Sequence, residues 1–131
     1  MKFMLMMHAP RGDGGYKINE WKQEDFRAHI QFMKDLNKDL RAAGELVGVK
    51  GLAPPGQTRV VRSFDGTLEV TDGPFAESKE FLAGYWIVDV ENAERAYAIA
   101  GRASTAPGPG GKPLGIKIEV RQVMSVPPDS L

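Results

Sequence analysis

Among the residues of this chain, His29 has the type and position that most suggest chemistry. Histidine changes its protonation state near neutral pH and is therefore a common general acid or base in enzymes. His29 lies three residues after Phe26 and four before Met33, so it falls inside the apolar stripe of a predicted helix and should face whatever that helix covers. Burial there favours a neutral ring that can accept a proton. The alternative is a histidine that only packs.

A second histidine and one aspartate complete the candidate catalytic set. His8 ends an apolar run and precedes a glycine-rich segment, so it either lines the same cleft as His29 or simply ends a strand. Asp72 precedes Gly73-Pro74, and an aspartate in such a position commonly accepts backbone hydrogen bonds in a turn. Its carboxylate is equally suited to orient a histidine ring and select its tautomer. The sequence leaves both interpretations of Asp72 open.

Three further side chains are candidates for substrate binding. Arg121 shares a strand face with Glu119, where its guanidinium either pairs with a neighbouring strand or binds an anion. Trp86 follows Tyr85, so one ring should pack under the helices and the other should point toward a partner sheet or a cleft. Phe75 is expected to anchor its loop on the core, with a place in the substrate site as the alternative.

The composition argues against several classes of function. The 131 residues contain 17 Lys and Arg against 17 Asp and Glu, so the chain lacks the basic field that attracts nucleic acid or anionic lipid. There is no cysteine, which excludes disulfides and thiolate nucleophiles. Without a metal-ligand spacing, a phosphate loop or a dinucleotide fingerprint, we expect neither a metal nor a cofactor. No apolar run is long enough to span a membrane, and the expected compartment is the cytoplasm.

Periodicity predicts one domain over residues 1–126 and a flexible tail over residues 127–131. The first helix should be capped by Asn19 and end at Gly44. Asp65-Gly66 predicts a hairpin turn between two strands. The remaining expected elements are strands at 2–8, 45–52, 58–64, 67–71, 81–90 and 116–123, a helix at 91–103 and a surface loop at 106–113.

This order of elements favours an α+β sandwich with two helices on one face of a mostly antiparallel sheet. The first strand is apolar on both faces, because Phe3 and Leu5 alternate with Met4 and Met6. The face opposite the helices therefore needs a partner. Sheet-to-sheet packing in a homodimer is the simplest way to bury it.

The chain resembles the YCII-related, or DGPF-domain, family over most of its length. The motifs that carry the likeness are the apolar strand ending in His8, residues 42–47 at the end of the first helix, residues 70–80 (VTDGPFAESKE) leading to Gly84-Tyr85-Trp86, and residues 118–121. The resemblance implies a ferredoxin-like fold that dimerises through its sheets as a dimeric α+β barrel.

The resemblance also implies two kinds of function. Some YCII-like relatives are small lyases or dehydrochlorinases with a histidine and an aspartate in the cleft, and their histidine lies in the first helix in a pattern similar to the segment around His29. Other members are encoded beside alternative sigma factors. We therefore expect either a cofactor-independent acid–base enzyme of the lyase or isomerase type that acts on a small organic acid, or a non-catalytic module that binds a small-molecule ligand or a regulatory protein.

Overall fold

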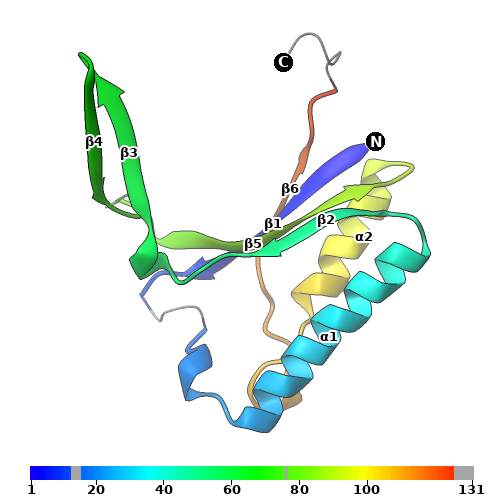
Figure 1. The fold of residues 1–131 in the computed structure, drawn as a ribbon. Helices are drawn as coiled ribbons and strands as arrows, with labels where there is room; N and C mark the ends of the chain where they lie inside the picture. Colours follow the sequence, from blue (N-terminus) through cyan, green and yellow to red (C-terminus); the bar gives the residue numbers. More distant parts are fainter. Residues whose placement is uncertain (13–15, 76, 126–131) are drawn as a thin grey trace.

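Four antiparallel strands form the central sheet in the order β2-β5-β1-β6. A computed structural model of the chain describes residues 1–12, 16–75 and 77–125 (Figure 1). The predicted tail, residues 127–131, lies outside these described residues. The sheet strands are β1 (Lys2–Pro10), β2 (Leu46–Gly51), β5 (Glu80–Asp89) and β6 (Ile118–Gln122).

Two helices, α1 (Gln23–Ala42) and α2 (Ala93–Ser104), cover one face of this sheet and leave the other face open (Figure 1). Helix α1 connects β1 to β2, and α2 connects β5 to β6. With this strand order, the arrangement is the predicted ferredoxin-like α+β fold. Within the described residues, no helix combines the length and the apolar character needed to cross a membrane.

The core forms where alternate residues of β1 and β5 face the helices. Phe3 pairs with Val88 and Leu5 pairs with Trp86, and all four side chains are buried. Trp86 is therefore a core residue, and its indole Nε1 donates to Oδ1 of Asn37 in α1 at 2.8 Å. Val90, directly after β5, also belongs to the buried cluster, and the helices contribute its other members: Leu36, Leu40, Ala96, Ile99, Ala100 and Ala103. Tyr85 points to the opposite face, as its place next to Trp86 predicts.

The first helix begins later than the sequence predicts. Asn19 is not its cap, because it lies in a separate 3-10 turn, Ile18–Glu20, and α1 starts only at Gln23. Trp21 stays outside the helix, where its Nε1 donates to the carbonyl oxygen of Tyr16 at 2.9 Å. A short-range hydrogen bond, between residues five apart in the chain, thus holds Trp21 outside the helix. The apolar positions of the predicted helix are widely spaced after Trp21, and α1 begins within that gap.

The buried face of α1 is narrower than the predicted stripe. His29, Leu36 and Leu40 are its buried residues, whereas Phe26 and Ile30 are exposed. The helix ends as predicted, because Gly44 follows it with a φ of 72°. Burial of His29 on the same face as two core leucines sets up the site described below.

A second, two-stranded sheet consists of β3 (Arg59–Phe64) and β4 (Thr67–Asp72). Asp65 and Gly66 join the strands with φ angles of 50° and 74°, the backbone that the predicted tight hairpin turn requires. The hairpin projects from one end of the central sheet, on the side away from the helices (Figure 1).

Glu45, directly before β2, forms an ion pair with Arg95 of helix α2. Nε and NH2 of Arg95 donate to its two carboxylate oxygens, each at 2.8 Å. These hydrogen bonds lower the pKa of Glu45 below its usual value of 4.5, against the opposing effect of partial burial. Because the folded-state pKa is lower than the unfolded one, the pair stabilises the protein above that usual value. The stabilisation is lost as the pH falls through the lowered pKa.

We expect Glu45→Gln to reduce the free energy of unfolding by about 1 kcal/mol at neutral pH, since it removes a paired charge that is only partly exposed. Urea unfolding at neutral and at acid pH measures this, and the difference from wild type should shrink on acidification. The control is Glu91→Gln, because Glu91 is exposed and pairs with no basic side chain in the described part of the chain. A difference that persists at acid pH would contradict the assignment to the charged pair.

Candidate functional site

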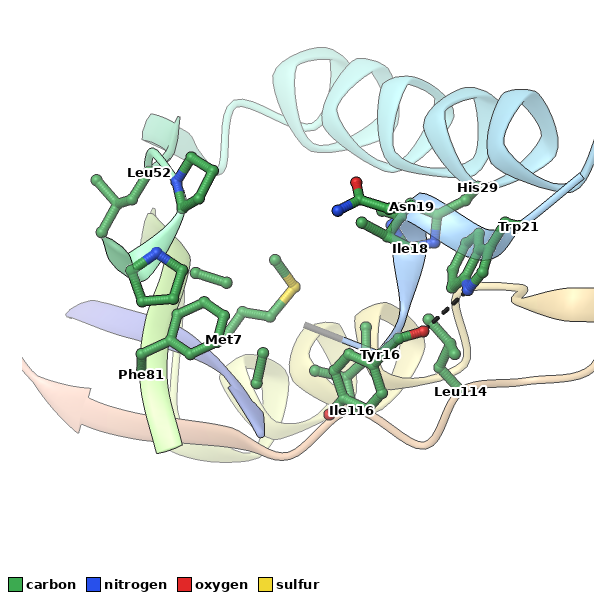
Figure 2. A pocket seen from close by; sticks show the side chains of 14 residues that line it. Met7, Tyr16, Ile18, Asn19, Trp21, His29, Leu52, Phe81, Leu114 and Ile116 are labelled. Carbon is green, nitrogen blue, oxygen red and sulfur yellow. Dashed lines mark hydrogen bonds between the residues drawn. The ribbon is translucent and has the colours of Figure 1, made fainter. Parts of the chain in front are cut away.

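A cavity of about 260 Å³ lies between the sheet, the start of α1 and the segments around Trp21 and Leu114. Figure 2 shows Met7, Leu52 and Phe81 on one side of this cavity, with Trp21 and Leu114 across from them. Its polar lining comes from Tyr16, Asn19, Trp21 and His29. No Asp, Glu, Lys or Arg is among the described residues that line it. The volume is at the small end for ligand sites and suits a small, mostly apolar molecule.

A bulge in β5 turns Phe81 and Ala83 toward the cavity. The pairing of β1 with β5 skips Ala83, because Met7 pairs with Gly84 and the next residue of β1 pairs with Leu82. Simple alternation along β5 would place Phe81 and Ala83 on the open face of the sheet. The extra residue reverses their direction, so that both line the cavity. An isolated glycine within a strand pattern, here Gly84, is the sequence signal for such a bulge.

His29 presents one unprotonated ring nitrogen. Its Nδ1 lies 3.0 Å from the carbonyl oxygen of Pro107. A carbonyl can only accept, so Nδ1 carries the proton, and in the neutral ring Nε2 has a free lone pair. The residue is only 9% exposed, and Trp21 packs edge-on against the ring with centroids 5.5 Å apart. No partner of Nε2 is found among the described residues. An imidazole held in one orientation at the wall of an apolar cavity has the geometry that a general base requires.

His8 does not share this cavity. Its neighbours Met7 and Ala9 line the cavity, so alternation places the side chain of His8 on the open face of the sheet. There Nε2 of His8 lies 2.6 Å from Oε1 of Glu119 in β6. The ring nitrogen is buried and its direction does not meet hydrogen-bond geometry, so this is a close electrostatic contact and not an aligned hydrogen bond. Arg121, two residues along β6, also lies outside the cavity lining.

Asp72 lies at the end of β4 with its side chain 94% exposed, and its carboxylate is 3.5 Å from Nε of Arg59. The orienting role considered for it at His29 is filled by the carbonyl of Pro107. Phe75 is 65% exposed, so the expectation that it packs on the core is wrong. Its loop is held through the backbone instead, because NH1 of Arg11 donates to the carbonyl oxygen of Phe75 at 3.0 Å.

Of the six candidate site residues, His29 alone is among those that line the cavity. Trp86 is enclosed in the core, while His8, Asp72, Phe75 and Arg121 lie elsewhere on the surface or the open face. The sequence interpretation missed Tyr16, Asn19 and the carbonyl of Pro107, and it assigned Trp21 to the helix. Within the described residues, no cluster of three or more histidine, aspartate or glutamate side chains is placed to hold a metal ion.

Comparison with known proteins assigns the family. A model of the YCII-related domain matches residues 1–109. The chain belongs to the YCII-related domain family. An uncharacterized protein of Rhizobium meliloti (strain 1021) is 30% identical over 86 residues, which is 66% of this chain and 69% of that relative. The family match includes His29 and Pro107 of this YCII-related protein, but it ends before Leu114 and Ile116 of the cavity wall.

Gly84 offers a test of how closely β2 approaches β5 next to the bulge. A Cβ on Gly84 would lie 2.8 Å from the carbonyl oxygen of Lys50, whereas a Cβ on its pairing partner Gly51 would meet nothing within 4 Å. We expect Gly84→Ala to cost about 1–3 kcal/mol of unfolding free energy, because backbone must move to relieve the overlap. Gly51→Ala is the matched control. Equal urea midpoints for the two variants would contradict the crowding at the bulge.

Proposed function

We propose that this YCII-related protein binds a small, uncharged organic molecule in the cavity and performs cofactor-independent acid–base chemistry on it, with His29 as the base. The observation that carries the proposal is the hydrogen bond from Nδ1 of His29 to the carbonyl of Pro107. Because Nδ1 is the donor in this hydrogen bond, Nε2 of His29 is the nitrogen that can accept a proton, and His29 lines the cavity.

The lining favours a neutral substrate over the ionised organic acid that the sequence suggested. A carboxylate moved into this cavity would lose its hydration without gaining a cationic partner among the described lining residues. A neutral molecule with one weakly acidic C–H or O–H group avoids that cost. Asn19, whose side chain lines the cavity, supplies an amide that can donate to an oxygen that becomes negative as the proton leaves.

The chemistry needs no outside reactant. A substrate proton passes to Nε2 of His29, and the electron pair it leaves behind forms a new double bond. The imidazolium then returns the proton to another atom of the same molecule in an isomerisation, or to the leaving group in an elimination. The carbonyl of Pro107 can accept from Nδ1–H throughout, because Nδ1 is protonated in the neutral ring of this orientation and in the cationic ring.

The alternative function is a non-catalytic module that binds a ligand in the same cavity as the sensing part of a regulatory system. The carbonyl partner of His29 favours it to some degree, because a carbonyl stabilises an imidazolium less than the carboxylate partner of an acid–base dyad does. Both functions require ligand binding beside His29. They differ in whether a proton leaves the ligand.

A thermal-shift screen of neutral fragments tests the cavity, because a ligand that binds only the folded state raises the melting temperature. We expect hits with wild type and none with Ala83→Phe, whose added ring fills the cavity. Ala28→Phe is the matched control, since Ala28 lies on the exposed side of α1 next to His29. Hits that survive Ala83→Phe would place binding elsewhere.

Deuterium exchange separates the two functions. A hit with an acidic C–H, incubated with protein in D₂O and followed by NMR, should exchange that proton faster with wild type than with His29→Asn. Asparagine can still donate to the carbonyl of Pro107, but it provides no base in place of Nε2. Binding to both proteins without accelerated exchange would favour the non-catalytic module.

A further inference from the structure

Residues 104–116, between α2 and β6, fold back on themselves as a hairpin-like segment, hereafter the 104–116 loop. Its backbone hydrogen bonds run from Ile116 N to the Ser104 carbonyl at 3.2 Å, from Leu114 N to the Ala106 carbonyl at 3.0 Å, and from Gly108 N to the Lys112 carbonyl at 2.7 Å. The Ser104 hydroxyl also donates to the Ile116 carbonyl at 2.7 Å. The segment predicted as a surface loop therefore has a ladder of its own, with the 3-10 turn Pro109–Gly111 at its tip.

Pro107 occupies a position in this ladder whose backbone groups point outward. It pairs with Pro113 between two of the hydrogen bonds, and residues at such positions of an antiparallel pair do not bond to each other. Proline also has no N–H group to leave unsatisfied. The carbonyl of Pro107 accepts from Nδ1 of His29 instead. The ladder therefore fixes the group that orients the candidate base.

Leu114 belongs to the same ladder and forms part of the cavity wall. Its side chain lies across the cavity from Met7 and Phe81 (Figure 2). It also packs on Gly108, because a Cβ there would lie 2.5 Å from Cδ2 and 3.0 Å from Cγ of Leu114. The absence of a side chain at Gly108 thus leaves the space that Leu114 occupies. A ligand that presses on Leu114 presses on the residue that follows Pro107.

The volume of the cavity bounds the ligand that fits without moving Leu114. An apolar cavity of about 150 Å³ inside a protein admits benzene. The cavity beside His29 measures about 260 Å³, so it admits a molecule with one ring and a short substituent. Tyr16, Trp21 and Phe81 contribute aromatic rings to the lining, which suits a flat ligand.

We propose that Leu114 determines the specificity of the site by limiting the ligand to one ring with a short substituent, and that the 104–116 loop couples this limit to the orientation of His29. A ligand that fits leaves the loop in place. A bulkier ligand pushes Leu114 against Gly108, and a close-packed segment transmits that displacement to the Pro107 carbonyl. The base then loses its alignment even though the ligand is bound. This inference rests on the proposed function, because it concerns the same cavity and the same base.

Two neutral probes that differ only in bulk test the size limit. They are 4-methylphenol and 4-tert-butylphenol, titrated into the protein by calorimetry. Wild type should bind 4-methylphenol more tightly, and Leu114→Ala should shift the ratio of the two dissociation constants by at least about tenfold toward the bulkier probe. Leu68→Ala is the matched control, because Leu68 is 67% exposed on the β3–β4 hairpin. The ratio compares two ligands on one variant, so a change in stability does not produce it.

Nitrogen-15 NMR of the histidine rings tests the coupling. Free wild type and its complex with 4-methylphenol should both show His29 with the proton on Nδ1. Gly108→Ala, whose added methyl group displaces Leu114, should show a mixture of tautomers, and so should the wild-type complex with 4-tert-butylphenol. Gly101→Ala is the control, since a Cβ on Gly101 meets nothing within 4 Å. The variant His8→Gln assigns the signals, because the chain has two histidines.

Each measurement has a result that overturns the inference. An unchanged ratio for Leu114→Ala, or a wild type that binds neither probe at millimolar concentration, removes Leu114 as the size limit. A single Nδ1–H tautomer in Gly108→Ala removes the coupling. A wild type that shows both expected effects without accelerated deuterium exchange of any bound ligand supports the inference and counts against the proposed acid–base chemistry alone.

Discussion

The antiparallel pairing of β1 with β5 is the constraint on which the other features depend. It runs from Lys2 opposite Asp89 to Pro10 opposite Glu80 and is interrupted at one point, Ala83. Before the interruption, alternate residues of both strands form the core under the helices. Beyond it, the reversed direction of the β5 side chains forms one side of the cavity. The β1–β5 pairing, with Ala83 as its one extra residue, therefore gives a packed core at one end of the sheet and the cavity at the other.

The contact between His29 and Pro107 joins α1 to the loop that follows α2. A backbone carbonyl does not titrate near neutral pH, so it can accept from Nδ1–H and hold the ring in one orientation whether the ring is neutral or charged. A carboxylate partner would stabilise the imidazolium more strongly. Orientation by a carbonyl is weaker but independent of pH, which suits the role of a base proposed for His29, because such a base must release its proton again.

The segment Asp72-Gly73-Pro74-Phe75 has a structural role in the described chain. It joins the projecting hairpin to the central strand β5, and Arg11 at the end of β1 holds it by donating to the carbonyl oxygens of Phe75 and Ser78. A Cβ on Gly73 would lie 2.9 Å from Cγ2 of Thr58 and 3.0 Å from Cγ2 of Val60, so any larger residue there would have to displace these two side chains. The most recognisable motif of the sequence thus positions the hairpin, while the candidate base lies in α1.

Local patterns in the sequence were enough to determine the α+β order of elements, the turn at Asp65-Gly66, the end of α1 at Gly44 and the opposite directions of Trp86 and Tyr85. These features depend on neighbours a few residues away. Tertiary structure decided the bulge at Ala83, the carbonyl that orients His29 and the separation of His29 from His8 and Asp72. Pro107 is 78 residues from His29 along the chain, and a bulge reverses a strand face without changing its composition. Periodicity carries no information about either, because both are set by which distant segments come into contact.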